Sequence, residues 1–244
     1  MAYRRVRDIG VCLLEERKGK LAEVRFVDPE RELGLKRPPS AEQCAEAINN
    51  FCHQHEIRVL LLDGPQGWKD RDTELKYCRA CERVLHTPGK VGVDEDHVKP
   101  PSWKRFAKFS IDVFAKLVEL GAVRVTEPIV GSPSGALLVV ESFPTSAWWM
   151  LGIQSLPAKA KASEADIKNR FEALRKRFAF RVEGDKAQPS HDDLQALVAG
   201  LAGVAILAGN PGGFVAVGLP PRTKKGVTVE GYIVNPRLEA QAGM

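Results

Sequence analysis

Apolar and polar residues in the first quarter of the chain follow two successive patterns. Residues 9–28 alternate as in a β-hairpin. Residues 40–55 repeat apolar side chains at helical spacing, and Ser40 with Gln43 has the sequence of a capping box. Residues 57–63 are then an almost continuous apolar run that ends in an aspartate, which is typical of a strand covered on both faces. The chain therefore opens as β-β-α-β.

The remaining chain alternates between helical and strand-like patterns. Helices are predicted from Ser102, Ser163 and Ser190, and strands at residues 122–126, 136–143, 214–218 and 231–234. Residues 64–101 are rich in charge, proline and glycine, so we expect a surface insertion there. No internal repeat is present. The sequence predicts one α/β domain over residues 1–244, with a mixed sheet and helices on both of its faces.

Composition places the chain among soluble globular proteins. Hydrophobic residues make up 44% and charged residues 27%, which excludes disordered, fibrous and disulfide-scaffold classes. The start is polar, no apolar run reaches ~18 residues, and the five cysteines are an odd number. We therefore expect a cytoplasmic protein with reduced thiols and no membrane partner. The net charge of +5 permits an anionic partner such as nucleic acid.

Three carboxylates stand at equivalent places in the predicted elements. Asp63 ends the first buried strand, Glu141 ends the second, and Asp192 lies in the first turn of the last helix. Ligands of α/β sheets collect beyond the carboxyl ends of strands, so these acids could share a site. Oxygen ligands suit Mg²⁺ or Mn²⁺, and two such ions could activate water against a phosphodiester.

Each acid also has a purely structural explanation. Asp63 precedes Gly-Pro and could begin a turn. Asp192 and Asp193 lie where the helix dipole stabilises anions by ~0.3–1 kcal/mol each. Glu141 follows four apolar residues in a strand that we expect to be buried, where an unpaired carboxylate would cost several kcal/mol. Glu141 therefore needs a partner or a metal.

Several common site signatures are absent. The sequence has no phosphate-binding G-x-x-x-x-G-K-[ST], no G-x-G-x-x-G and no G-x-S-x-G. Cys78 and Cys81 form a single C-x-x-C pair without a second one, which does not favour a zinc site. P-loop nucleotidases, dinucleotide oxidoreductases and α/β-hydrolases thus lack their local motifs here.

A series of motifs resembles one family over about residues 57–236. In order they are LLLDGPQGW, R-x-C-E-R-x-L at 79–85, ESFPTSAWWMLG, PAKAK, DDLQALVAGLAG and EGYIVNP. Together they resemble the family called domain of unknown function 429, whose members are described as predicted nucleases with an RNase H-like fold. The resemblance implies a five-stranded mixed sheet with acids at the ends of the first strand, the fourth strand and the last helix. The family's nuclease label is an inference, and together with the three acids and the positive charge it leads us to expect a nuclease that depends on Mg²⁺ or Mn²⁺.

The resemblance assigns roles to particular residues. Catalysis and metal binding would fall to Asp63, Glu141 and Asp192, and phosphate contact to Arg79, Lys159 and Lys161. Arg79 with Glu82 could instead fix its loop. One departure is Gln195, which occupies the place of the second acid in the usual D-x-x-D-A-L pattern of the last helix. Its carbonyl oxygen could still bind a cation, but one negative charge is lost.

A second departure lies at the N-terminus. An RNase H-like sheet begins with an apolar central strand that carries an acid, yet residues 9–28 already resemble the second and third strands. A first strand within residues 1–10 would be very short, with Asp8 as a further metal ligand. Alternatively the true start lies upstream, or the strand and the activity have been lost. A missing strand would leave unpaired backbone groups beside residues 57–63.

Three functions therefore stay open at the level of sequence. The first is a metal-dependent nuclease. The second is a non-catalytic RNase H-like module that binds nucleic acid or a protein, which Gln195 and the short N-terminus favour. The third is a small-molecule phosphotransferase, and the absence of a duplicated domain weighs against it.

Overall fold

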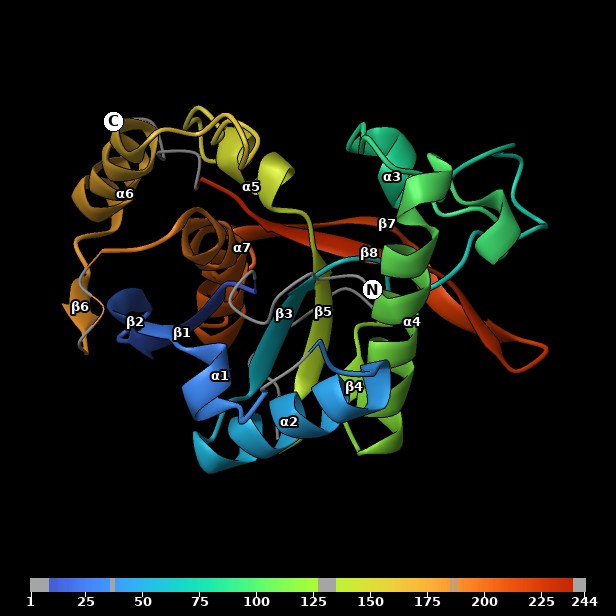
Figure 1. Cartoon of the computed structure of the whole chain (residues 1–244), viewed down its shortest axis with the longest axis horizontal. Helices are drawn as coiled ribbons and strands as arrows, with labels where there is room; N and C mark the ends of the chain where they lie inside the picture. The colour runs from blue at the N-terminus through green and yellow to red at the C-terminus, as the bar shows by residue number, and fades with distance from the viewer. Residues whose placement is uncertain (1–8, 36–37, 127–134, 185, 187, 239–244) are drawn as a thin grey trace.

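The predicted N-terminal hairpin is present and belongs to a three-stranded sheet. A computed structural model describes residues 9–35, 38–126, 135–184, 186 and 188–238 (Figure 1). β1 (Val11–Arg17) pairs antiparallel with β2 (Lys20–Val27), and β6 (Arg181–Glu183) pairs parallel with β2. The strand order is β1-β2-β6. β1 is thus one edge of this sheet.

A second, five-stranded sheet holds the other strands. They are β3 (Val59–Asp63), β4 (Val123–Arg124), β5 (Leu138–Ser142), β7 (Phe214–Lys224) and β8 (Val227–Pro236). The order is β3-β5-β8-β7, and the short β4 also pairs with β5. β3, β4 and β8 run parallel to β5, whereas β7 and β8 form an antiparallel hairpin. The sheet is therefore mixed, and β3 is one of its edges.

The described helices are α1 (Pro29–Glu32), α2 (Ala41–Gln54), α3 (Ala80–Val84), α4 (Lys104–Glu119), α5 (Pro144–Met150), α6 (Glu164–Phe178) and α7 (His191–Leu207), with 3-10 turns η2 (Glu95–His97) and η3 (Pro101–Trp103). α2 and α4 cover one face of the five-stranded sheet and α7 covers the other. Ser40, Ser163 and Ser190 cap their helices as predicted. Ser102 does not, because it lies within η3 and Trp103 takes the cap position of α4.

The two faces of the sheet have separate cores. Leu60, Leu62 and Val139 pack against α2 and α4, and Leu61 and Val140 pack against α7. This division follows from the alternation of side chains along a strand. α7 also packs against the other sheet, with its residues Leu194, Leu197 and Leu201 in one apolar cluster with Val24 and Phe26 of β2. α7 therefore joins both sheets (Figure 1).

The sequence predicted the mixed α/β class correctly, but the arrangement differs in two respects. The described strands form two sheets rather than one, because none of them lies between β1 and β3. Residues 64–101 are also not simply surface. Trp68 bridges to Val229 of β8, and Cys81 and Leu85 are buried against β7 and β8. The RNase H-like topology remains a prediction. Among the described helices, we find none with the length and apolarity that a bilayer crossing requires.

Candidate functional site

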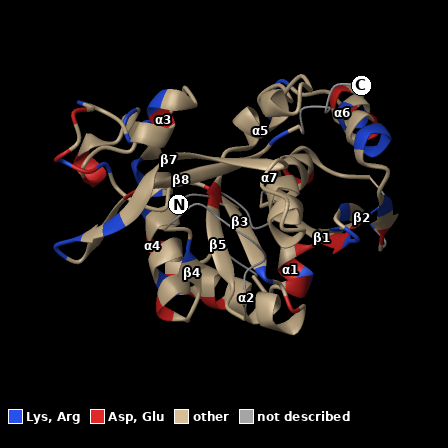
Figure 2. Ribbon diagram, turned by 180° about the vertical axis from the view of Figure 1, so that it is seen from behind, with Lys and Arg blue, Asp and Glu red and all other residues tan. Residues whose placement is uncertain are grey.

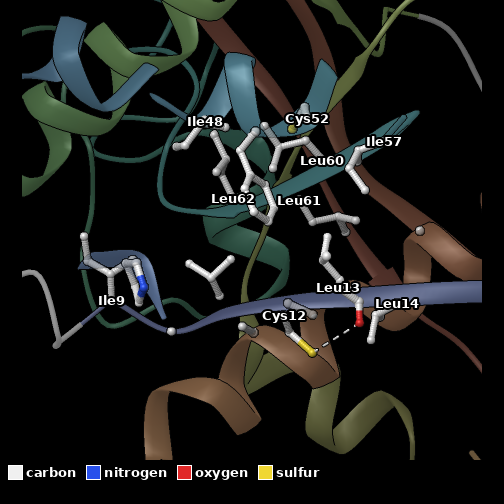
Figure 3. A pocket seen from close by; sticks show the side chains of 18 of the residues that line it. Ile9, Cys12, Leu13, Leu14, Ile48, Cys52, Ile57, Leu60, Leu61 and Leu62 are labelled. Carbon is white, nitrogen blue, oxygen red and sulfur yellow. Dashed lines mark hydrogen bonds between the residues drawn. The ribbon is translucent and has the colours of Figure 1, made fainter. Parts of the chain in front are cut away.

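A cavity of about 1140 Å³ lies between β1 and β3. Figure 3 shows Leu60, Leu61 and Leu62 of β3 and Leu13 of β1 around this space. Apolar residues make up most of the lining. One group of polar residues lies where β3 ends and α7 begins, namely Asp63, Ser142, His191, Asp192 and Gln195. Charged residues of β1, β2 and α1, such as Glu15, Arg25 and Glu32, line other parts of the cavity. The structure brings two of the three candidate acids, Asp63 and Asp192, to one cavity.

Asp63 is the acid without a partner. Asp63 lines the cavity at the end of β3, and solvent reaches its side chain there. Burial raises the pKa of Asp63 to about 7, and the negative charges of Glu141 and Asp192 add to this effect. Within the described residues no cation or hydrogen-bond donor offsets it. Asp63 can therefore exchange a proton near neutral pH.

Asp192 has the opposite electrostatic character. The Nδ1 atom of His191 lies 3.1 Å from one carboxylate oxygen, and Lys159 forms an ion pair with the other. Burial alone would raise the pKa of Asp192, but the hydrogen bonds from His191 and Lys159 outweigh it, so the pKa is lowered. Two neighbouring acids with pKa values moved apart are typical of paired acid and base roles.

His191 is held between two acceptors. Besides its contact with Asp192, its Nε2 atom lies 2.9 Å from the carbonyl oxygen of Pro157. The hydrogen bond to Asp192 raises the pKa of His191, burial opposes this, and the Pro157 carbonyl supports it. The side chain of His191 is 11% exposed. Its two hydrogen-bonding contacts hold the imidazole in place beside the Asp192 carboxylate.

Ser142 is a cavity residue that sequence reasoning missed. It pairs with Asp63 in the β3–β5 register, so both side chains lie on the same face of the sheet. Its hydroxyl oxygen is buried and has no hydrogen-bond partner within the part of the chain that the structure describes. The signal was available, because alternation along a strand puts Ser142 on the opposite face from Glu141. A buried hydroxyl without a partner at this point is a candidate ligand-binding group.

Glu141 is buried but does not open into the cavity. Arg79 donates two hydrogen bonds to its carboxylate, at 2.8 and 2.6 Å, and the backbone N–H of Gln66 donates a third at 2.9 Å. Burial raises the pKa of Glu141, and the Arg79 guanidinium opposes this rise. The partner that the sequence required for Glu141 is thus an arginine.

Arg79 belongs to a buried network of charged side chains. It is only 1% exposed, and its Nε atom donates to Glu82 at 3.0 Å. Glu230 of β8, which sequence reasoning missed, accepts from the backbone N–H groups of Asp70 and Ala80 at 3.1 and 3.0 Å. These contacts hold residues 66–91 against the sheet. The geometry thus favours the loop-fixing role of Arg79 over contact with phosphate.

The remaining predicted residues occupy different surroundings. Lys159 is paired with Asp192, and Lys161 is exposed on the same loop but does not line the cavity. The side-chain oxygen of Gln195 accepts a hydrogen bond from Trp148 Nε1 at 2.8 Å, so it is already engaged. Asp8 lies outside the described residues.

A model of one protein family, described as Protein of unknown function (DUF429), matches residues 8–217. The chain belongs to this family. The match includes Asp63, Glu141 and Asp192 and ends within β7. Neither the curated proteins nor the solved structures contain a match to the chain. Membership in the DUF429 family therefore carries no established activity.

The oxygen donors at the cavity resemble those that Mg²⁺ uses. In the described part of the chain, no three histidine, cysteine, aspartate or glutamate side chains are placed to hold one metal ion. Asp63 and Asp192 nevertheless open into one cavity, which is also lined by Ser142, whose buried hydroxyl oxygen has no hydrogen-bond partner among the described residues. Mg²⁺ is usually bound by one or two carboxylates together with water and substrate phosphate. This donor set fits a hard cation better than zinc, because it contains no sulfur or free imidazole.

Proposed function

We propose that this DUF429 protein is a metal-dependent hydrolase that acts on phosphodiester bonds of nucleic acid. One observation carries the proposal. Asp63, at the end of a strand, and Asp192, at the start of a helix, open into one cavity, and Asp63 has no cationic partner among the described residues. A divalent cation would compensate this charge. Clefts at the carboxyl ends of strands are also where α/β proteins bind ligands.

Each cavity residue then has a distinct role. Asp63 and Asp192 would hold Mg²⁺ or Mn²⁺, with the Ser142 hydroxyl as a neutral donor. The bound cation would polarise the phosphoryl oxygen and lower the pKa of water. His191 keeps Asp192 ionised and oriented through its hydrogen bond. Lys159, the nearest cation on the α5–α6 loop, would attract the substrate phosphate.

Charge on the molecular surface favours an anionic polymer as substrate. The chain has a net charge of +5. In Figure 2, lysine and arginine positions lie on the ribbon of α6 and near the turn between β7 and β8. None of the α6 arginines lines the cavity. They would therefore contribute to encounter with a phosphate backbone rather than to the reaction.

One observation favours the second function, a non-catalytic nucleic-acid or protein binding module. Arg79 neutralises Glu141, so the third predicted acid is not available as a ligand without breaking a buried ion pair. Two carboxylates bind a cation more weakly than three. A module of this kind would bind nucleic acid in a salt-dependent way and leave it intact.

A cleavage assay separates the two functions. The chelator-treated protein is incubated with fluorescently labelled single-stranded DNA, duplex DNA, RNA and RNA–DNA hybrid, with and without Mg²⁺ or Mn²⁺. We expect cleavage only with metal. Asp63→Asn should reduce it by about 100-fold or more, since loss of even an outer-shell partner costs about 10–100-fold.

The matched control for this assay is Asp112→Asn, which changes an acid of α4 whose side chain is exposed and does not line the cavity. It should cleave like the wild type. Cleavage that survives chelation, or that persists in Asp63→Asn, contradicts the proposed function. Salt-dependent binding without cleavage under either metal supports the binding module instead.

A further inference from the structure

We infer that the segment between β3 and α4 carries a second anion site, which binds a backbone phosphate of single-stranded nucleic acid. The site is a cavity of about 510 Å³ with two walls, one between Lys69 and Lys76 and one between Val93 and His97. We call it the phosphate pocket. It shares no lining residue with the cavity between β1 and β3. The inference rests on the proposed function for the identity of the polymer.

Lys69 supplies a buried positive charge that no carboxylate neutralises. The residue is 4% exposed, and its Nζ atom donates to the Asp70 carbonyl oxygen at 2.7 Å and to Thr73 Oγ1 at 3.1 Å. Both acceptors are uncharged, and within the described residues this ammonium forms no ion pair. An ammonium has three N–H donors, so one remains for a ligand. Because buried charges need a partner of opposite sign, that ligand should be an anion.

The acids nearest to Lys69 in the sequence are paired with another lysine. Lys224 of β7 lies 2.6 Å from a carboxylate oxygen of Asp70 and 2.6 Å from one of Asp72. Asp70 also accepts a hydrogen bond from the backbone N–H of Asp72 at 3.0 Å. These carboxylates are therefore engaged with the β7–β8 hairpin, and the charge of Lys69 remains available to a ligand.

Positive charge exceeds negative charge around the phosphate pocket. The described lining contains three permanent cations, Lys69, Arg71 and Lys76, and one acid, Glu74. Arg71 is also offset by Asp94, which lies 3.4 Å away and outside the lining. A net positive charge remains after both acids are counted. Lysine and arginine bind phosphate through charge-assisted hydrogen bonds, and the volume is within the range of about 300–1,000 Å³ for ligand sites.

Backbone contacts hold the two walls of the pocket in place. The N–H of Trp68 donates to the carbonyl of Thr228 in β8 at 3.0 Å, and the N–H of Lys69 donates to the carbonyl of Gly92 at 2.8 Å. Gly92 packs so closely that an added Cβ would lie 2.3 Å from the Cβ of His97. The walls are thus fixed to each other and to the sheet. A preorganised site loses little conformational entropy when a ligand binds.

An exposed aromatic ring beside the pocket favours a nucleic-acid strand over a free anion. Tyr77 follows Lys76 and is 59% exposed. The ammonium groups of Lys76 and Lys99 lie 5.3 and 5.4 Å from the centre of its ring, and neither forms an ion pair within the described residues. Proteins bind single strands by stacking bases on aromatic rings while nearby cations contact the backbone. These surroundings therefore suit a strand with unpaired bases.

The chain length keeps the pocket close to the proposed hydrolase site. Lys69 is only six positions after Asp63. Their Cα atoms are therefore at most ~22 Å apart, since an extended residue spans at most ~3.6 Å. Phosphates of one strand in a duplex advance ~3.4 Å each, so about six nucleotides cover this distance. One strand can thus contact both sites.

Fluorescence anisotropy of the full chain in EDTA measures strand binding apart from cleavage. The probe is a fluorescein-labelled single-stranded DNA of about 15 nucleotides, the size of a typical single-strand site. Lys69→Met should weaken binding about fivefold at 0.1 M salt, and the slope of log K against log salt should fall by about 0.7, as for the loss of one phosphate contact. An oligomer of the same sequence with an uncharged backbone should not respond to this substitution.

Matched variants locate the binding site. Lys20→Met removes the same charge from the exposed turn of the β1–β2 hairpin and should leave the affinity and the slope unchanged. Lys76→Met changes an exposed residue of the pocket and should act like Lys69→Met. Because Lys76 is exposed, this variant decides the test if circular dichroism shows that Lys69→Met does not fold. Tyr77→Leu should weaken binding about fivefold or more with an unchanged slope, because stacking carries no charge.

Several results would overturn the inference. These are the absence of salt-dependent strand binding, wild-type affinity in the folded pocket variants, and an equal loss in Lys20→Met, which would mean that only net charge matters. Calorimetry with inorganic phosphate distinguishes the source of the anion. If Lys69 is needed for free phosphate but not for the strand, the pocket is a free-phosphate site and the inference is wrong.

The cleavage assay described above separates this inference from the proposed function. Cleavage by the wild type, together with strand binding that does not depend on Lys69 or Lys76, contradicts the phosphate pocket alone. Strand binding that depends on these lysines, without cleavage under either metal, supports the phosphate pocket and contradicts the hydrolase alone.

Discussion

Asp63 and Glu141 are carboxylates on neighbouring strands, one register position apart, yet their surroundings are opposite. Glu141 receives three hydrogen bonds, two of them from Arg79, and is 2% exposed. Asp63 receives none that the structure describes and faces a cavity. A buried acid with all its partners in the chain serves the fold, whereas an acid without partners is available to a ligand. By this criterion Glu141 is a structural residue and Asp63 is a candidate functional residue.

The largest expected effect comes from removing the arginine that is paired with Glu141. Arg79→Met removes the guanidinium and leaves Glu141 and Glu82 as buried carboxylates without their cation. Loss of one partner of a buried ion pair typically costs about 3–5 kcal/mol. The free energy of unfolding, measured by urea denaturation at pH 7, should fall by about this amount.

The control for this prediction is Arg83→Met, which replaces an exposed arginine on the same helix, α3. It should change the free energy of unfolding by less than about 0.5 kcal/mol. Equal effects of the two substitutions would mean that the Arg79–Glu141 pair does not hold the loop to the sheet.

Replacing Asp63 should have the opposite effect and increase the free energy of unfolding. The pKa of Asp63 is about 7 in the folded protein and near 3.8 ordinarily, so the native state loses stability as the pH rises from about 4 to 7. Asp63→Asn cannot ionise and should escape this loss. Since cavity water screens the carboxylate, we expect a gain on the order of 1–2 kcal/mol at pH 8.

Thermal denaturation at pH 4.5 and pH 8 checks this prediction. The melting temperatures of wild type and Asp63→Asn should be similar at pH 4.5 and separate by about 3–6 °C at pH 8. A variant that is less stable than the wild type at pH 8 would show that Asp63 has a stabilising partner. The gain in stability would accompany the loss of cleavage, as is common for ligand-binding residues.

The smallest expected effect concerns His191, the hydrogen-bond partner of Asp192. Asp192 lies at the cavity like Asp63, but it has partners in the chain like Glu141. The folded-state pKa of His191 is raised, so its hydrogen bond to Asp192 stabilises the protein below the ordinary histidine pKa. This stabilisation is lost as the pH rises through the raised value. His191→Ala should therefore cost about 0.5–1 kcal/mol at pH 5.5 and less at pH 9. A cost that is the same at both pH values would show that packing, not charge, is involved.

The sequence predicted local structure well because its signals are local. Ser40, Ser163 and Ser190 each begin a helix, and the apolar run of β3 is a strand. Ser102 misled the prediction, since Pro101 begins the 3-10 turn η3 and Ser102 lies inside that turn. Helix boundaries thus depended on caps that neighbouring prolines could displace.

The sequence did not predict the relations between distant residues. That Glu141 needs a partner followed from its apolar neighbours, but that the partner is Arg79, 62 positions away, depends on how the loop folds back. Gln195 was predicted as a ligand position, whereas its oxygen is taken by Trp148. The separate edges of β1 and β3 were foreseen only as the consequence of a missing strand. Pairings over such separations are set by tertiary packing rather than by local pattern.

α7 packs against strands from both ends of the chain, and this has a consequence for synthesis on the ribosome. β2 ends at Val27 and α7 begins at His191, so roughly 160 residues are added before the hairpin meets the helix that covers it. At ~5–20 residues per second this takes on the order of 10–30 s. During that time the apolar face of the nascent hairpin, with Val24 and Phe26, lacks its native cover. The N-terminal hairpin is therefore the segment of this chain that we expect to engage chaperones first.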